Sequence, residues 1–299
     1  MTAPGVDAVL ARLRLLVTRR LDGLLHGDHL GLLPGPGTEA GESRPYAAGD
    51  DVRHMDWPVT ARTTVPHVRQ TVADRELEAW LGVDLTASLD FGTAQRTKRE
   101  VALAATAAVA LLAARGGNRV GAVLDTGGGR PVRLPARSGP RGVQALLRRV
   151  ATAAPAGPGD LGALVESLRR PPRRRGLAVL VTDFVGPVAA WARPLRVLGA
   201  RHDVLAVEVL DPRELTLPDV GHLTVVDAET GARHEVPTGS RRVRRAYAEA
   251  AAAHRAGVAA ALRDAGASHL RLRTDSDWLR DIVGFVAARR HARARGTAT

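Results

Sequence analysis

The sequence predicts an α/β protein whose mainly parallel sheet carries helices on both faces. From about residue 78 onward, apolar segments of strand length alternate with helical segments, and this alternation is typical of parallel sheets. The helical segment 93–115 is apolar on nearly all sides, which indicates a helix buried on most faces. Two of the apolar strand segments lead directly into an aspartate, Asp84 and Asp183. The predicted class is therefore Rossmann-like.

The predicted elements follow one another in a regular order after an N-terminal extension. Residues 7–26 place apolar side chains at helical spacing, residues 27–51 are rich in glycine, proline and polar residues, and residues 65–73 look extended. Strands are predicted at 78–84, 118–124, 131–134, 177–181, 203–210 and 269–274, helices at 93–115, 141–152, 161–169, 188–198, 243–264 and from 278, and a β insertion within 211–240. We expect an N-terminal helix and extension over 1–77, the α/β domain over 78–290 and a disordered tail over 291–299.

Composition excludes several function classes. The chain has no cysteine, which rules out disulfides, thiol nucleophiles and cysteine-ligated metals. The net charge is +12, and Lys98 is the only lysine. We interpret the arginines as solvated surface rather than as a nucleic-acid face, because few of them lie beside aromatic residues that could stack on bases. The apolar run 101–114 is too short to span a bilayer, and no signal-peptide pattern is present, so we expect a cytoplasmic protein.

The strand end at Asp84 carries the pattern Asp84-x-Thr86-x-Ser88. In an extended strand alternate residues point to one side, so one carboxylate and two hydroxyls would converge there. Such hard oxygen ligands suit Mg²⁺. If the strand before Asp183 is a neighbour in the sheet, both carboxylates face one crevice at the carboxyl ends of the strands.

A longer series of segments carries a family resemblance. The most specific is RPYAAGDDVR at residues 44–53, continued by Asp56-Trp57 and Ala61-Arg62, and after it come DLTAS at 84–88, VTDF at 181–184 and DPRE at 211–214. With these segments in this order, the chain resembles the bacterial family called domain of unknown function 58, whose core is a von Willebrand factor A-like domain.

The resemblance implies a metal-ion-dependent adhesion site. Thr86 and Ser88 would ligate Mg²⁺ directly, and Asp84 and Asp183 would act mostly through water. Two departures from the family pattern stand out. Thr86 replaces a serine, and Gly159 stands where a threonine ligand is expected, a place that water could fill. For the adjacent Asp160 we favour a helix N-cap.

The block of residues 44–62 has two interpretations. Its arginines, with Arg69, could form an anion- or partner-binding face, or they could pair with nearby carboxylates and pin a loop against the sheet, which is the alternative we favour. The residues assigned to this partner-binding or structural role are Arg44, Asp50, Arg53, Asp56 and Arg62.

These observations lead to three hypotheses about function. The first is a non-enzymatic protein-interaction module, which the resemblance suggests is an adaptor of a MoxR-type AAA+ ATPase in protein assembly or maturation. The second is a Mg-dependent phosphoesterase-like hydrolase that uses Asp84 and Asp183, although no general base is evident. The third is a basic nucleic-acid-binding protein, whose affinity would fall steeply with salt.

Overall fold

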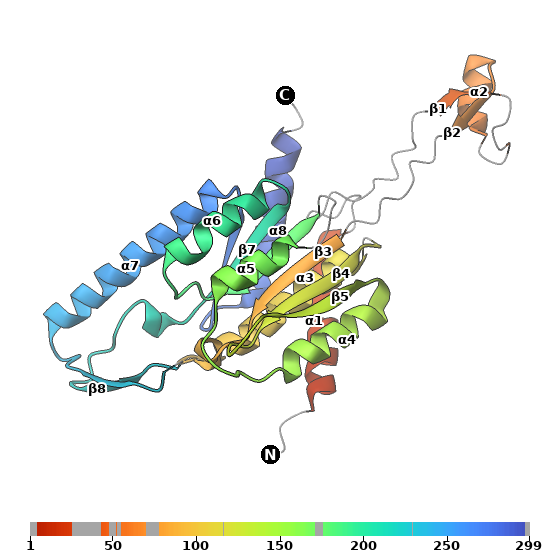
Figure 1. Ribbon diagram of the computed structural model, residues 1–299. Coiled ribbons are helices and arrows are strands. Elements are labelled where there is room, and N and C mark those ends of the chain that lie inside the picture. Colours follow the sequence, from red (N-terminus) through yellow and green to blue (C-terminus); the bar gives the residue numbers. More distant parts are fainter. Residues whose placement is uncertain are drawn as a thin grey trace.

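The computed structural model describes residues 5–25, 43–47, 52, 55–69, 78–115, 117–170, 176–228 and 230–296. A six-stranded sheet forms the centre of this part of the chain (Figure 1), with the strand order β10-β7-β6-β3-β4-β5. The strands are β3 (Glu78–Asp84), β4 (Arg119–Asp125), β5 (Val132–Arg137), β6 (Leu177–Thr182), β7 (Asp203–Leu210) and β10 (Ser268–Arg273). Every neighbouring pair is parallel except β4 with β5. This topology confirms the predicted Rossmann-like class.

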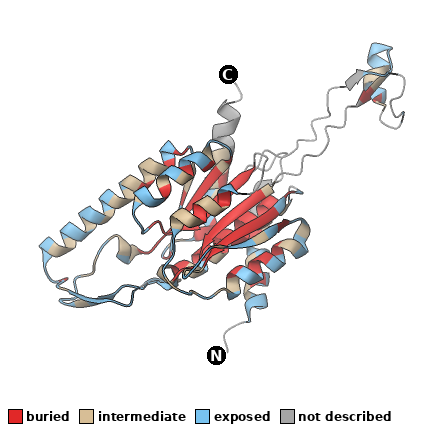
Figure 2. Ribbon diagram, viewed as in Figure 1, coloured by how far each residue is buried: buried red, intermediate tan, exposed pale blue. Residues whose placement is uncertain are grey.

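Helices cover both faces of the sheet. The face bearing Leu81 and Val83 packs against α1, α3, α4 and α8, and the face bearing Trp80 packs against α5, α6 and α7. The bounds are α1 (Val6–Leu25), α3 (Lys98–Arg115), α4 (Gly139–Thr152), α5 (Leu161–Arg169), α6 (Val188–Gly199), α7 (Arg241–Asp264) and α8 (Trp278–Gly296). Figure 2 shows the sheet strands buried between these layers.

Small residues allow the layers to approach closely. Helix α3 is rich in alanine, and most of its side chains are buried, as the all-round apolar pattern predicts. On the opposite face, a Cβ added to Gly82 of β3 would lie 2.7 Å from Cδ1 of Leu168 in α5. A larger residue at this position would require the Leu168 side chain to shift.

The N-terminal residues divide between two places. Helix α1, which the sequence analysis grouped with the extension, packs against α3, α4 and α8 and buries Leu10 and Val17 in their core. Farther along, β1 (Ser43–Pro45) and β2 (His67–Arg69) form a separate antiparallel pair with helix α2 (Trp57–Thr63) between them in sequence. The domain boundaries proposed from the sequence stay a prediction.

Several predicted bounds differ from the structure. The first buried helix begins at Lys98 rather than at residue 93. Helix α8 continues to Gly296, into the segment predicted to be a disordered tail. The apolar stripe of this helix, which includes Trp278 and Ile282, belongs to the core, and Arg289 pairs with Asp203 at the start of β7.

The predicted β insertion is present between β7 and α7. It consists of β8 (Leu223–Val226) and β9 (Arg233–Val236), which pair with each other as an antiparallel hairpin. Among the described helices, none is both long enough and apolar enough to cross a membrane.

Candidate functional site

The two predicted aspartates lie at adjacent strand ends. Strand β3 ends at Asp84, and its parallel neighbour β6 ends at Thr182, directly before Asp183. In the strand order, β3 and β6 are the pair at which the winding direction reverses, where α/β sheets bind ligands. Both aspartates are almost fully buried, and the charge of Asp183 acts on Asp84. The structure therefore brings them together at one edge of the sheet, the place predicted for the crevice.

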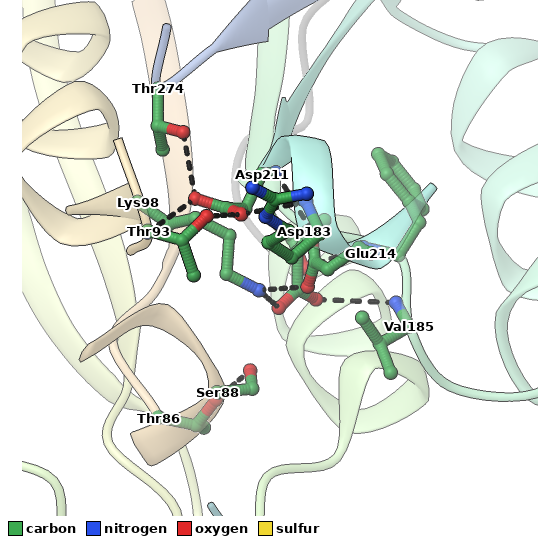
Figure 3. A network of polar contacts seen from close by, with 12 residues as sticks. Thr86, Ser88, Thr93, Lys98, Asp183, Val185, Asp211, Glu214 and Thr274 are labelled. Carbon is green, nitrogen blue, oxygen red and sulfur yellow. Dashed lines mark hydrogen bonds and ion pairs between the residues drawn. The ribbon is translucent and has the colours of Figure 1, made fainter. Parts of the chain in front are cut away.

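Hydroxyl groups surround the Asp84 carboxylate. Its Oδ1 accepts hydrogen bonds from the Thr86 backbone N–H (3.1 Å) and the Thr86 hydroxyl (2.8 Å), and its Oδ2 accepts one from the Thr182 hydroxyl (2.7 Å). The hydroxyls of Thr86 and Ser88 lie 3.2 Å apart (Figure 3). Asp84, Thr86 and Ser88 are thus joined in one hydrogen-bonded chain.

The reason for this convergence differs from the one predicted. The extended geometry does not continue through the pattern, because residues Ala87–Asp90 form a 3₁₀ helix that begins after Thr86. The tight turn, rather than strand alternation, brings the Ser88 hydroxyl back to Thr86. The predicted juxtaposition is correct, and its predicted cause is wrong.

Burial and a like charge perturb the ionisation of Asp84. Desolvation, followed by the negative charge of Asp183, raises the pKa of Asp84 from 3.8 to about 6, although hydrogen bonds from Thr182 and Thr86 act in the opposite direction. The rise reflects the burial of Asp84 first and the neighbouring negative charge second.

Lys98 places a positive charge beside Asp183. The side chain is 1% exposed, and Nζ donates to Oδ2 of Asp183 (2.8 Å) and to Oε1 of Glu214 (2.5 Å), as Figure 3 shows. Burial lowers the pKa of Lys98, but the two carboxylates outweigh it, so that its pKa lies above the ordinary value. Lys98 is therefore held as an ammonium ion between two carboxylates.

A third strand end positions Glu214. Strand β7 is followed by Asp211, which caps the short 3₁₀ helix Pro212–Glu214, and Oε2 of Glu214 accepts from the Asp211 backbone N–H (2.9 Å). The Asp211 carboxylate also accepts from the hydroxyls of Thr93 (2.5 Å) and Thr274 (2.8 Å). The DPRE segment is thus fixed at both ends, and Glu214 points at Lys98.

Lys98 and Glu214 are not among the site residues that the sequence predicts. Their contact joins residues 116 positions apart, so that spacing alone cannot reveal it. One signal was available: Lys98 is the only lysine among 43 lysines and arginines, and it stands at the start of a helix whose side chains are mostly buried.

Gly159 lies against Thr86, as the family pattern implies for the missing threonine. A Cβ on Gly159 would lie 2.4 Å from Cγ2 of Thr86 and 3.4 Å from Oδ2 of Asp125. Asp125 holds the loop in place, because its Oδ2 accepts a hydrogen bond from the Asp160 backbone N–H (3.0 Å). Asp160 caps α5 as predicted: its side chain accepts from the backbone N–H of Ala163 (2.9 Å). The methyl group of Thr86 therefore occupies the space that a larger residue 159 would need.

These residues fit a divalent cation poorly. No side-chain oxygen is available at Gly159, one oxygen of Asp183 is held by the Lys98 ammonium, and both oxygens of Asp84 already accept hydrogen bonds. In the described part of the chain, no group of three or more histidines, cysteines, aspartates or glutamates could hold a metal ion, so any donor set depends on the hydroxyls of Thr86 and Ser88. Magnesium binding stays a prediction.

The signature block contributes a small structured unit made of β1, α2 and β2. Asp56, which is buried, caps helix α2 by accepting from the Val59 backbone N–H (3.3 Å). Arg62 lies exposed on the same helix. Asp50 and Arg53 lie outside the described residues, as does the side chain of Arg44. The predicted ion pairing of these arginines therefore stays a prediction.

The same unit exposes apolar side chains. Trp57 at the start of α2 is 67% exposed, Val52 is 65% exposed, and Tyr46 and Val65 are also exposed. The other three tryptophans of the chain, Trp80, Trp191 and Trp278, are buried. The sequence analysis quoted Trp57 as part of the block but gave it no role.

Comparison with known proteins identifies the family. Residues 42–257 match the family model described as protein of unknown function DUF58. An uncharacterized protein of Mycobacterium tuberculosis is 56% identical over 296 residues, which cover 98% of this chain and 92% of that protein.

Two solved structures are also similar. BatB from Bacteroides thetaiotaomicron has a TM-score of 0.47 and 14% identity, over 72% of this chain and 99% of that one. A von Willebrand factor type A protein from Catenulispora acidiphila has a TM-score of 0.39 and 14% identity, over 75% of this chain and 43% of that one. The chain belongs to the family of proteins of unknown function DUF58.

Proposed function

We propose that the protein is a non-enzymatic, cytoplasmic interaction module, and that its partner is a MoxR-type AAA+ ATPase for which it acts as an adaptor in protein assembly or maturation. The identity of the partner rests on the family resemblance. The proposal that the chain binds a protein rests on one observation above all, the exposure of Trp57 in the family-signature unit.

The contrast among the tryptophans carries this step. The chain is poor in aromatic residues, at 3% of its length, and three of its four tryptophans are used in the core. A tryptophan left 67% exposed, with Tyr46 and Val52 exposed in the same unit, has the composition of a protein-binding surface. Tryptophan and tyrosine are also the residues that most often dominate binding energy in such surfaces.

The crevice at the strand ends is the second surface of the proposal. In its metal-dependent form, Mg²⁺ on Thr86 and Ser88 would be completed by an acidic side chain of the partner. In its metal-independent form, the partner would meet the hydroxyls directly. The two forms predict different responses of partner binding to a chelator.

The experiment is an affinity capture of a MoxR-type ATPase from the same host by the tagged chain. Replacing Trp57 by alanine should weaken capture by about tenfold or more, since truncating such an anchor commonly costs 2 kcal/mol or more. Val226→Ala on the β8–β9 hairpin is the matched control, because that side chain is 54% exposed and lies outside the signature unit. Undiminished capture by the Trp57 variant would contradict the proposal.

A second arm tests the crevice. Capture is repeated with Asp84→Ala and Asp183→Ala, and with and without EDTA. Loss of capture in both variants and in EDTA would support metal-dependent adhesion. Loss in the variants alone would support metal-independent binding, and undiminished capture throughout would exclude the crevice from the interface.

A further inference from the structure

We infer that the positive charge of this adhesion-type site is supplied by the ammonium group of Lys98, so that the site holds its geometry without a divalent metal ion. The inference goes beyond the proposed function, because it concerns the site whether or not a partner binds there. It rests on three observations: the position of the ammonium group, its burial, and the fit between Thr86 and Gly159.

The first observation is the place of the ammonium group. Lys98 Nζ lies 2.8 Å from Oδ2 of Asp183, the carboxylate to which the family pattern gives a metal-binding role, and 2.5 Å from Oε1 of Glu214. In Figure 3 the Ser88 hydroxyl points towards the Lys98–Asp183 pair. A cation attached to helix α3 therefore already occupies one oxygen of the second aspartate.

The second observation is the burial of this ion pair. The side chains of Lys98 and Asp183 are 1% and 4% exposed, and that of Glu214 is 17% exposed. A lysine is almost never fully buried unless it is paired, and removing one partner of a buried pair leaves a charge that nothing balances. The arrangement is consequently a fixed part of the fold rather than a surface contact that a metal ion could easily displace.

The third observation is the way in which Thr86 and Gly159 fit together. Gly159, at the position where the resemblance implies a threonine ligand, has no side-chain oxygen, and a Cβ added there would lie only 2.4 Å from the methyl carbon of Thr86. The loop therefore presents a methyl group beside Thr86 instead of an oxygen donor. A magnesium site requires oxygen ligands.

The single lysine allows a test on the unmodified protein. Reductive methylation labels accessible amines, and the native chain should be labelled only at its N-terminal amine, with Lys98 protected in the same way in the presence and absence of millimolar Mg²⁺. The unfolded chain is the control and should be labelled at both amines. Labelling of Lys98 in the native protein, or an increase when Mg²⁺ is added, would overturn the inference, because either result would mean that the ammonium is free or displaced.

A direct metal titration gives a second measurement. With free Mn²⁺ followed by electron paramagnetic resonance and Mg²⁺ as competitor, the native chain should bind no ion at this site. Lys98→Met should gain affinity by about tenfold or more, since Asp183 and Glu214 then lack a cation. Arg119→Met is the matched control: it removes the same charge from the pair with Glu78 at the other end of β3 and β4, and should gain nothing.

The remaining outcomes of the titration also decide the question. Binding of one Mn²⁺ by the native chain that Asp84→Asn abolishes would refute the inference, as would equal affinities for the Lys98 variant and the control. If Lys98→Met does not fold, the labelling of the native chain decides alone. Neither measurement involves a partner, so failure of this inference is distinguishable from failure of the proposed function.

Discussion

Replacing Gly159 by alanine should destabilise the protein, and replacing Thr86 by serine in the same chain should remove most of that effect. The two residues touch through one methyl group, since the added Cβ would lie 2.4 Å from Cγ2 of Thr86. Without Cγ2, the next nearest atoms to that Cβ are Oδ2 of Asp125 and Cβ of Thr86, both at 3.4 Å. The clash therefore depends on a single atom that serine lacks.

The magnitudes follow from the packing. Inserting a methyl group into a filled space costs about 1–3 kcal/mol, and alanine returns up to about 1 kcal/mol by restricting the unfolded chain, so Gly159→Ala should cost about 1–2 kcal/mol. Thr86→Ser should cost about 1 kcal/mol for the lost buried methyl group. In the double variant the new methyl group takes the place of the old one, and the coupling free energy should be about 2 kcal/mol in favour of the pair.

Urea unfolding of the four proteins measures this coupling. The matched control combines Gly159→Ala with Thr106→Ser, which removes a methyl group from another fully buried threonine, in helix α3, and which should be additive within about 0.5 kcal/mol. Additivity of the Thr86 pair within the same margin would refute the proposed contact between the two residues.

Two further predictions concern buried charges. The pKa of Asp84 is raised to about 6 in the folded chain, so its protonated form stabilises the fold at low pH, and this stability is lost as pH rises from the unfolded pKa through about 6. The loss in unfolding free energy should be about 3 kcal/mol. Urea unfolding over this pH range should show the loss in the wild type but not in Asp84→Asn, and parallel profiles for the two proteins would contradict the prediction. Glu208 is fully buried and pairs with Arg255 (3.0 Å), His269 (2.8 Å) and Arg271 (3.0 Å). Glu208→Ala should therefore lower the unfolding free energy of the protein by about 3–5 kcal/mol, while the exposed control Glu235→Ala should change it little.

The strands could be predicted well because their apolar runs have sharp ends. Strands β3 and β7 have the predicted bounds 78–84 and 203–210, since each begins at a polar residue and continues into buried apolar positions. The start of α3 was placed five residues early because Thr93 and its neighbours are compatible with a helix in sequence. In the structure, the backbone N–H and hydroxyl of Thr93 instead donate to Asp211 at the end of β7, a contact over 118 positions that no local pattern contains.

The candidate site was predictable only in part, for a similar reason. Asp84 and Asp183 were found because parallel neighbouring strands must present their carboxyl ends at one edge. The resemblance marks Gly159 and Thr86 as departures from the family pattern. Only the structure shows that the two residues are in contact. Trp57 belongs to the signature block, but the sequence does not show that its side chain is exposed.

Contacts between side chains link three strand ends: one hydrogen bond joins β3 to β6, and Lys98 joins the residues that follow β6 and β7. Asp84 at the end of β3 is bonded to Thr182 of β6, Asp183 after β6 is bonded to Lys98, and Lys98 reaches Glu214 after β7. Each of these carboxylates is therefore held by a group of the same chain. With Lys98 as the cation, we expect the proposed partner, if it binds at these strand ends, to meet hydrogen-bonding groups such as the half-buried Ser88 rather than a metal ion.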